Sequence, residues 1–273
     1  MKLLNLVNLY KKEGYDEIDA NAKVCQDIVL LKISKSPLSK NVTIKGGVVM
    51  HSISNDKRRA TRDLDLDFIK YSLEDESIRK FIEKLNDNDI SIKIEITGKI
   101  EPLHHQDYDG KRVYVKLYDD TGFSISTKLD IGVQKQFDIE QDEYCFEIGT
   151  INESAKLLIN SKEQIIVEKL KSLLKFGYVS TRYKDIFDFY YLINNCNLNK
   201  DKMLEIIKIL IIDDNSVKEE NIEEIVITLK KVLNNKRYLR NLNTAKINWL
   251  ELPIDEVVES VLNYFENLLK VGV

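Results

Sequence analysis

The sequence has few of the residues that cross-link or interrupt a chain. Its three cysteines, Cys25, Cys145 and Cys196, are odd in number and far apart. This pattern argues against a disulfide framework and a cysteine-based zinc site, and it favours a reduced, cytoplasmic setting. Only three prolines and ten glycines occur, and they form no proline-rich or glycine-rich run, so no linker of that kind separates parts of the chain.

Long apolar runs are also absent. The first 17 residues are interrupted by asparagines and lysines and carry no signal-type cleavage site, so we expect a short amphipathic helix there. The most apolar later run, residues 203–212, contains Glu205 and Lys208 and falls short of the roughly 20 residues that cross a bilayer. No membrane association is therefore expected.

Neither sign of charge dominates. The 273 residues include 41 Lys and Arg against 45 Asp and Glu, a formal net charge of −4. A hydrophobic content of 43% supplies enough apolar material for a core and too much for a disordered polyelectrolyte. The length allows one large domain or two small ones.

The periodicity of apolar residues changes along the chain. The first 36 residues have helical spacing, and β-like stretches rich in Ile and Val follow at 42–45, 64–69, 90–100, 112–118 and 125–133. Beyond residue 161 almost everything is helical in pattern: 162–176, 181–193, 200–212, 217–233 and 254–269. This order predicts an α+β protein, with amino-terminal helices and a mixed β-sheet core in residues 1–150. Residues 151–273 are predicted to form a helical domain that contributes to the functional site.

An unusual run of acids lies in the second β-like stretch. Strand alternation puts Asp63, Asp65 and Asp67 on one face and apolar side chains on the other. Like charges repel and Asp is a poor strand former, so the arrangement favours a bound cation such as Mg²⁺. The simpler alternative is a solvated strand end. A further acid, Asp130, lies in another β-like stretch and completes a set of three carboxylates used in phosphoryl or nucleotidyl transfer, unless it is only a turn residue.

A glycine pair precedes the acid run. Gly46 and Gly47 follow a short β run and Lys45, and they precede a segment, 48–53, that can form a helix. A glycine turn that leads into a helix exposes backbone N–H groups to an anion, most often phosphate. Alternatively, the pair only permits tight packing.

Two further signals lie in the helical half. Lys169 falls inside the apolar arc of helix 162–176 and needs an anion, which is either a nucleotide triphosphate or a nearby Asp. Asp185 and Asp188 share a side of a helix that is otherwise aromatic and apolar, so we expect them to be buried and partnered.

A basic stretch lies between Glu224 and Glu251, where no acid occurs. It contains Lys236, Arg237 and Arg240, and we interpret it either as a surface for RNA phosphates or as an ordinary solvated helix face. The three histidines have no spacing that suggests a zinc site.

In order and spacing, these motifs resemble the AbiEii/AbiGii-type nucleotidyltransferases, toxins of bacterial toxin–antitoxin and abortive-infection systems within the polymerase-β-like superfamily. The matching segments are Lys45-Gly46-Gly47, RRATRDLDLDF at 58–68, LDIGV at 129–133, Glu168-Lys169-Leu170 and RYKDIFD at 182–188. The resemblance covers residues 21–192.

The resemblance implies particular roles for these residues. It implies metal binding by Asp63 and Asp65, with Asp130 as a less regular third ligand. It also implies that Lys169 contacts the nucleotide phosphates and that Asp188 is an essential acid, with the remaining nucleotide contacts made by Lys45, Gly46, Gly47 and Asp185. Family members carry a serine where Gly47 stands, so one hydroxyl contact is expected to be missing here.

The expected function is a nucleotidyltransferase toxin that moves NMP from an NTP to RNA, with the tRNA 3′ end as acceptor. Mg²⁺ or Mn²⁺ is the expected cofactor, and a cognate antitoxin is the expected partner, whether or not it contacts the toxin stably. Two alternatives stay open: transfer to a protein or a small molecule such as an antibiotic, and a catalytically silent protein that binds nucleotide or RNA.

Overall fold

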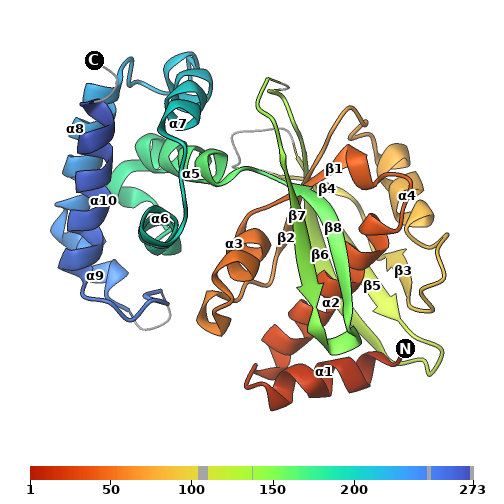
Figure 1. The fold of residues 1–273 in the computed structure, drawn as a ribbon. Helices are drawn as coiled ribbons and strands as arrows, with labels where there is room; N and C mark the ends of the chain where they lie inside the picture. Colours follow the sequence, from red (N-terminus) through yellow and green to blue (C-terminus); the bar gives the residue numbers. More distant parts are fainter. Residues whose placement is uncertain (104–109, 137, 245–246, 271–273) are drawn as a thin grey trace. The chain divides into compact units, whose positions relative to one another are not determined.

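The computed structural model describes residues 1–103, 110–136, 138–244 and 247–270. Contacts within the chain divide it into two compact units, Met1–Asn160 and Ser161–Val273, shown in Figure 1. The first unit is a mixed sheet with helices and the second is helical. The fold is therefore α+β, as the order of periodic segments predicts.

An eight-stranded sheet forms the centre of the first unit. Its strands are β1 (Val42–Lys45), β2 (Leu64–Phe68), β3 (Lys93–Ile96), β4 (Glu101–Pro102), β5 (Lys111–Tyr118), β6 (Ser124–Val133), β7 (Asp142–Ile148) and β8 (Glu153–Ile159). The order is β3-β5-β6-β2-β1-β8-β7, and β4 pairs with β5. The pairs β2–β6 and β1–β8 are parallel and the other pairs are antiparallel. Strand β2, which carries the acids, thus lies inside the sheet.

Strands β7 and β8 are a correction, because the sequence pattern predicts no strand between residues 133 and 161. Both contain charged or polar residues among the apolar ones, and on both about half of the side chains are exposed. Strand β7 forms an edge of the sheet, where polar side chains on a solvated face are tolerated. Their weak apolar signal explains why the pattern of Ile and Val misses them.

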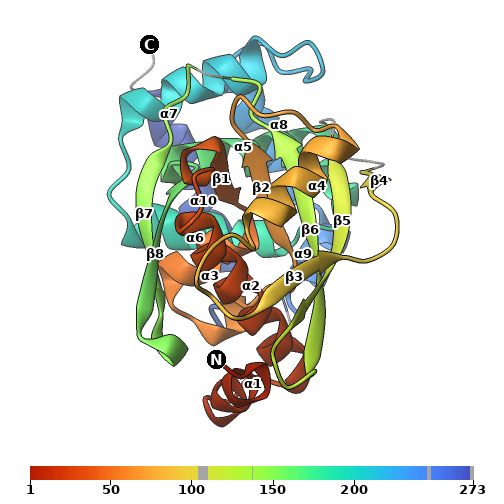
Figure 2. The ribbon, with the colours of Figure 1, turned by 90° about the vertical axis from the view of Figure 1, so that its right-hand side faces the viewer.

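The helices of the first unit are α1 (Leu3–Lys12), α2 (Glu17–Ser34), α3 (Gly47–Ser54) and α4 (Asp75–Lys84). Helix α2 is capped by the preceding residue Asp16, whose side chain accepts a hydrogen bond from the backbone N–H of Asp19. Helices α2 and α4 cover one face of the sheet (Figure 2). The fully buried Phe68 of β2 packs against Phe81 of α4, with ring centroids 5.0 Å apart. The alternate residues of β2 therefore point to the opposite face.

The second unit consists of α5 (Lys162–Phe176), α6 (Lys184–Asn195), α7 (Lys200–Ile207), α8 (Ile222–Leu233), α9 (Lys236–Leu242) and α10 (Ile254–Leu269). Helix α5 is capped by the preceding residue Ser161, whose hydroxyl accepts a hydrogen bond from the backbone N–H of Gln164 at 3.2 Å. The predicted bounds of α5 and α10 are confirmed. Over the described residues, no helix has the length and apolarity needed to span a membrane.

Candidate active site

The glycine pair forms the turn between β1 and α3. Gly46 has φ 73° and ψ −146°, a backbone conformation that residues with a Cβ rarely adopt, and Gly47 begins α3. No side chain caps this end of the helix and no acid lies in its first turn. The first N–H groups of α3 have no partner within the helix, so the turn presents the donors that an anion needs.

Each glycine lies against one side chain of the segment that leads into and through β2. A Cβ on Gly46 would lie 3.0 Å from Cγ of Asp65 and still closer to its Oδ2. A Cβ on Gly47 would lie 2.7 Å from both Cβ and Oγ1 of Thr61. The pair therefore permits tight packing, and this packing places Asp65 beside the anion-binding turn.

The sheet register aligns four charged residues across neighbouring strands. Lys45 of β1 pairs with Asp65 of β2, and Asp65 pairs with Asp130 of β6. Asp130 in turn pairs with Arg112 of β5. Residues that pair in register point to the same face of a sheet, so two central carboxylates are flanked by a basic residue on each side. We call Lys45, Asp65, Asp130 and Arg112 the charged row.

Basic side chains from neighbouring strands hold the other carboxylates. Arg112 donates two hydrogen bonds of 2.8 Å to the two oxygens of the buried Asp130. Lys128 lies 3.0 Å from the half-exposed Asp63, and Lys45 lies 2.7 Å from Asp67. The hydrogen bonds from Arg112 to Asp130 raise the pKa of the guanidinium above its ordinary value. Neither Arg112 nor Lys128 is identifiable from the sequence, since their pairing depends on register.

The carboxylates near the glycine turn can be compared with the ligands that Mg²⁺ takes in proteins. Among the described residues, no group of three or more His, Cys, Asp or Glu side chains is arranged to hold a metal ion. Mg²⁺ is usually held by one or two carboxylates, with substrate phosphates and water as its other ligands. Asp65 of β2 and Asp63, which directly precedes the strand, can supply those carboxylates. Asp130 pairs with Asp65 across the sheet, but both of its carboxylate oxygens accept hydrogen bonds from Arg112.

A second cluster of charges is buried within the helical unit. The ammonium of Lys169 on α5 contacts Asp185 and lies 2.9 Å from Asp188, both on α6. Asp188 is fully buried, and Lys169 and Asp185 are 7% and 8% exposed. The guanidinium Nε of Arg182 lies 3.1 Å from Asp185. The prediction that these two acids are buried and partnered is confirmed.

Aromatic side chains connect this cluster to helix α9. The rings of Tyr183 and Tyr238 lie 5.2 Å apart, and Asn241 donates to the hydroxyl of Tyr183 at 2.7 Å. Burial, together with the charge of Asp185, raises the pKa of Tyr238 above its ordinary value. Helix α9, which lies inside the predicted basic stretch, is therefore packed close to Asp185.

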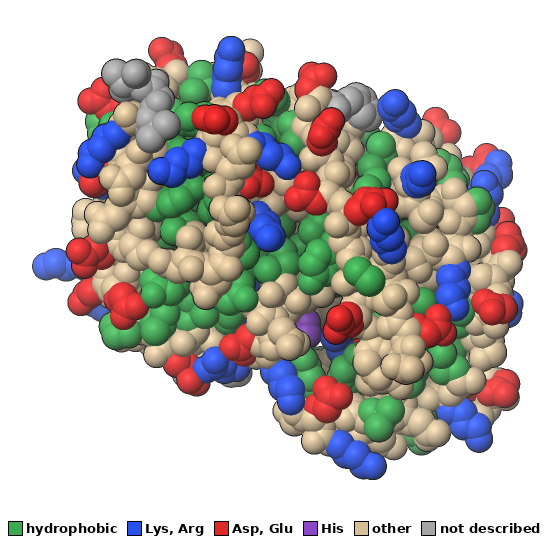
Figure 3. All heavy atoms as spheres, viewed as in Figure 1, with side chains coloured by type: hydrophobic (Ala, Val, Ile, Leu, Met, Phe, Trp, Pro, Cys, Tyr) green, Lys and Arg blue, Asp and Glu red, His purple; other side chains and the backbone are tan. Residues whose placement is uncertain are grey.

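The opposite side of α9 is exposed and basic. Lys236, Arg237 and Arg240 are all exposed or partly exposed, and within the described part of the chain none of them forms an ion pair with an acid. Lys246, which also belongs to the predicted basic stretch, lies outside the described residues, as do His104 and His105. On the face shown in Figure 3, basic and acidic side chains are otherwise interspersed.

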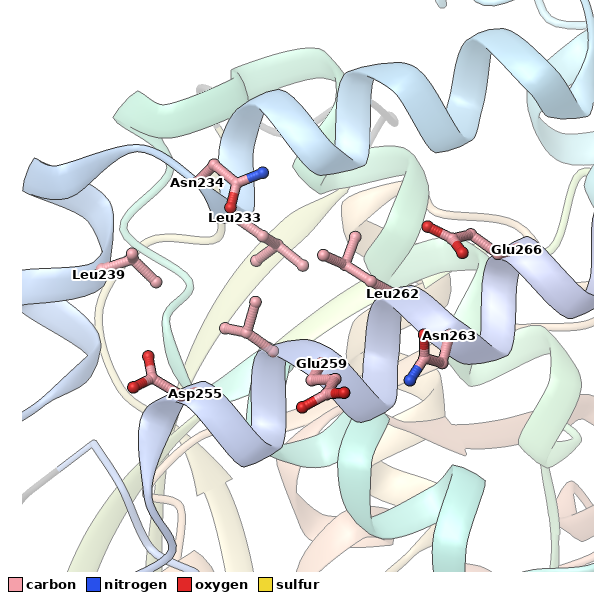
Figure 4. A pocket seen from close by; sticks show the side chains of 9 residues that line it. Leu233, Asn234, Leu239, Asp255, Glu259, Leu262, Asn263 and Glu266 are labelled. Atoms are coloured by element: carbon pink, nitrogen blue, oxygen red, sulfur yellow. The ribbon is translucent and has the colours of Figure 1, made fainter.

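A shallow groove of about 290 Å³ lies among α8, α9 and α10 (Figure 4). Apolar Leu233 and Leu262 line it, together with acidic Asp255, Glu259 and Glu266. None of the predicted site residues lines this groove, and its acidic rim repels phosphate groups.

The predicted residues thus form two groups, one in each unit. A family model described as the nucleotidyl transferase AbiEii toxin of type IV toxin–antitoxin systems matches residues 28–256. The chain belongs to the AbiEii family. The match includes the glycine turn, the charged row and the Lys169 cluster of this AbiEii protein. The protein is therefore a nucleotidyltransferase toxin of a toxin–antitoxin system. Membership in this family implies a nucleotide substrate and a cognate antitoxin. No curated protein matches the chain.

Proposed function

We propose that this AbiEii-family protein transfers NMP from an NTP to the 3′ end of tRNA, with release of pyrophosphate and dependence on Mg²⁺ or Mn²⁺. The observation that carries the proposal is the contact of Asp65 with Gly46, since it supports a metal-binding role for Asp65 beside a turn whose free N–H groups suit a phosphate. In the reaction, the 3′ oxygen of the RNA forms a bond to the α-phosphorus of the NTP and gives up its proton. The bond between that phosphorus and the oxygen that bridges it to the β-phosphorus breaks, so pyrophosphate leaves.

The first unit binds the triphosphate in this proposal. Backbone N–H groups of the first turn of α3 donate to phosphate oxygens, and Lys45 adds positive charge next to them. Asp63 and Asp65 would hold the metal. Asp130 would be the third carboxylate if one of its oxygens, both of which accept from Arg112, also bound the metal. When bound, the metal neutralises the charge that develops on the phosphates.

The second unit supplies Lys169, Asp185 and Asp188. The ammonium of Lys169 is held in place by two buried acids, and we assign it to the phosphates of the nucleotide, with Asp185 beside it. Asp188 keeps the ammonium in place and is therefore essential. This assignment follows the resemblance of residues 168–170 and 182–188 to the family motifs.

The acceptor in this proposal is RNA because α9 presents cations that no acid of the described residues neutralises. An RNA acceptor and a toxin family together support action in the cytoplasm, within an abortive-infection system that defends against phage. Proteins and small molecules are the competing acceptors.

The test is transfer of label from each of four [α-³²P]NTPs to total tRNA, cell extract or metabolites, with and without Mg²⁺. We expect labelled tRNA only when Mg²⁺ is present, and no label with Asp63→Asn or Asp65→Asn. Asp75→Asn is the matched control, because Asp75 is similarly exposed and also pairs with a lysine, at 2.7 Å from Lys111. Label found in protein or metabolites instead of tRNA would refute RNA as the acceptor. Transfer at the wild-type rate by Asp63→Asn or Asp65→Asn would refute the metal site.

A further inference from the structure

Thr61 covers the glycine at the start of α3. A Cβ on Gly47 would lie 2.7 Å from Cβ and Oγ1 of Thr61 and 2.9 Å from its Cγ2. Real side chains do not approach this closely, so residue 47 can have no side chain while Thr61 keeps this position. The hydroxyl oxygen of Thr61 therefore lies 2.7 Å from the point at which the side chain of a serine at position 47 would begin.

A buried amide fixes the backbone on which Thr61 sits. Gln26 of α2 is 3% exposed, and its Nε2 donates to the carbonyl of Thr61 at 2.8 Å. The same nitrogen lies 3.5 Å from the carbonyl of Asp63. Gln26 thus holds the residues just before β2 and fixes the place of Thr61 together with that of Asp63.

The hydroxyl of Thr61 is available to a ligand. Thr61 is only partly buried, and none of the hydrogen bonds among the described residues uses its hydroxyl. It lies beside the uncapped first turn of α3, whose N–H groups point toward an anion in the proposed function. A hydroxyl at this place can donate to an oxygen of the same phosphate.

We propose that Thr61 is a nucleotide-binding residue whose hydroxyl donates to the NTP phosphates at the start of α3. This inference rests on the proposed function and deepens it. From the sequence, a hydroxyl group is expected to be missing from the phosphate site because Gly47 replaces a serine. In this proposal the hydroxyl of Thr61, on a different segment, takes the place of the missing serine hydroxyl. Positions 47 and 61 then depend on each other, because a side chain at 47 would collide with the one at 61.

The experiment measures the affinity of the intact chain for an NTP and for inorganic tripolyphosphate by calorimetry, with Ca²⁺ in place of Mg²⁺. Thr61→Val keeps the shape of the side chain and removes the hydroxyl. We expect affinity for both ligands to fall roughly tenfold, as when one hydrogen bond to a charged group is removed. Thr61→Ser should bind both ligands nearly as tightly as the wild type. Thr97→Val, at an exposed threonine of the same unit, is the control.

A swap tests the pairing. Gly47→Ser alone should weaken NTP binding, because the new Cβ collides with Thr61. Combining Gly47→Ser with Thr61→Gly removes the collision and restores a hydroxyl, so binding should recover. Failure of the double variant to recover, in a chain that melts at the wild-type temperature, would overturn the pairing.

The outcomes separate this inference from the proposed function. Wild-type binding of both ligands by Thr61→Val would overturn the role of Thr61 and leave the proposed function intact. A loss confined to the NTP would also overturn it, because the hydroxyl would then bind the nucleoside. Absence of NTP binding by the wild type itself would overturn the inference and the proposed function together.

Discussion

The carboxylate of Asp65 occupies the space in which residue 46 would carry a Cβ. Because the turn must be glycine for steric reasons as well as for its positive φ, the position of the acid and the conformation of the turn depend on each other. A change in either one should therefore disturb the other.

Gly46→Ala should lower transfer activity about 100-fold, because even a displacement of about 1 Å of a reacting group can have an effect of this size. Gly98→Ala is the matched control: Gly98 has φ +80° against +73° for Gly46, but nothing lies within 4 Å of its Cβ position. Both variants should lose about 1 kcal/mol of stability from backbone strain, and Gly46→Ala should lose more because its Cβ also collides with Asp65. Equal activity of the two variants would show that Asp65 tolerates displacement.

Lys169→Ala should remove growth arrest when the chain is expressed in a bacterial host. The change also leaves Asp185 and Asp188 buried without their shared ammonium, so the unfolding free energy should fall by about 3 to 5 kcal/mol. Soluble protein must therefore be measured beside growth. Lys171→Ala is the control on the same helix, since Lys171 is more exposed and pairs with Asp214 instead.

Toxicity of the Lys169→Ala chain equal to that of the wild type would show that arrest does not need this lysine. A second variant, Lys169→Met with Asp188→Asn, separates folding from function. It should recover part of the stability, because fewer buried charges lack a partner, and it should stay non-toxic.

Neutralising Lys236, Arg237 and Arg240 together should weaken RNA binding and flatten its salt dependence. The slope of log affinity against log salt should change by roughly 0.7 to 0.9 for each RNA phosphate that is no longer neutralised. NTP affinity should stay the same, because these residues are not part of the proposed nucleotide site. The control neutralises three exposed lysines of the other unit, Lys80, Lys84 and Lys156, and so changes net charge equally. Equal slopes of log affinity against log salt in the two variants would show that α9 does not bind RNA specifically and is an ordinary solvated helix face.

His51 should make the first unit sensitive to acid. It lies on α3 with its Nε2 3.0 Å from the hydroxyl of Tyr15, and burial lowers its pKa from 6.5 to about 4. The unfolded chain therefore binds a proton between pH 6.5 and about 4 that the folded chain does not, so folding stability falls as pH falls through this window.

A comparison with His51→Gln isolates this effect. Glutamine can keep a hydrogen bond to Tyr15 and does not titrate, so the stability of the wild type relative to the variant should decrease from pH 6.5 to about pH 4. Chemical unfolding at closely spaced pH values measures the difference. A constant difference over this range would contradict a buried, neutral His51.

The sequence predicts best where the signal is local. Helices α5 and α10 have long amphipathic patterns, and the alternation of β2 separates Asp63, Asp65 and Asp67 from the apolar face. Lys169 is also identifiable, because a charge inside an apolar arc requires a partner whatever the tertiary fold.

Long-range pairing is what the sequence does not reveal. Arg112 meets Asp130 only because β5 and β6 pair in one register, and a shift by one residue would point the two side chains to opposite faces. The packing of Thr61 against Gly47 likewise depends on how a loop folds over a helix end. Such relationships leave no periodic trace in the chain.

The order of strands in the sheet determines when the charged row can exist. Strand β2 lies between β1 and β6, so Asp65 meets its neighbour Asp130 only after β6, which ends at Val133, has been synthesised. Strand β8, which flanks β1 on its other side, ends at Ile159. A nascent chain therefore lacks the complete sheet around these carboxylates until more than half of its 273 residues have been made.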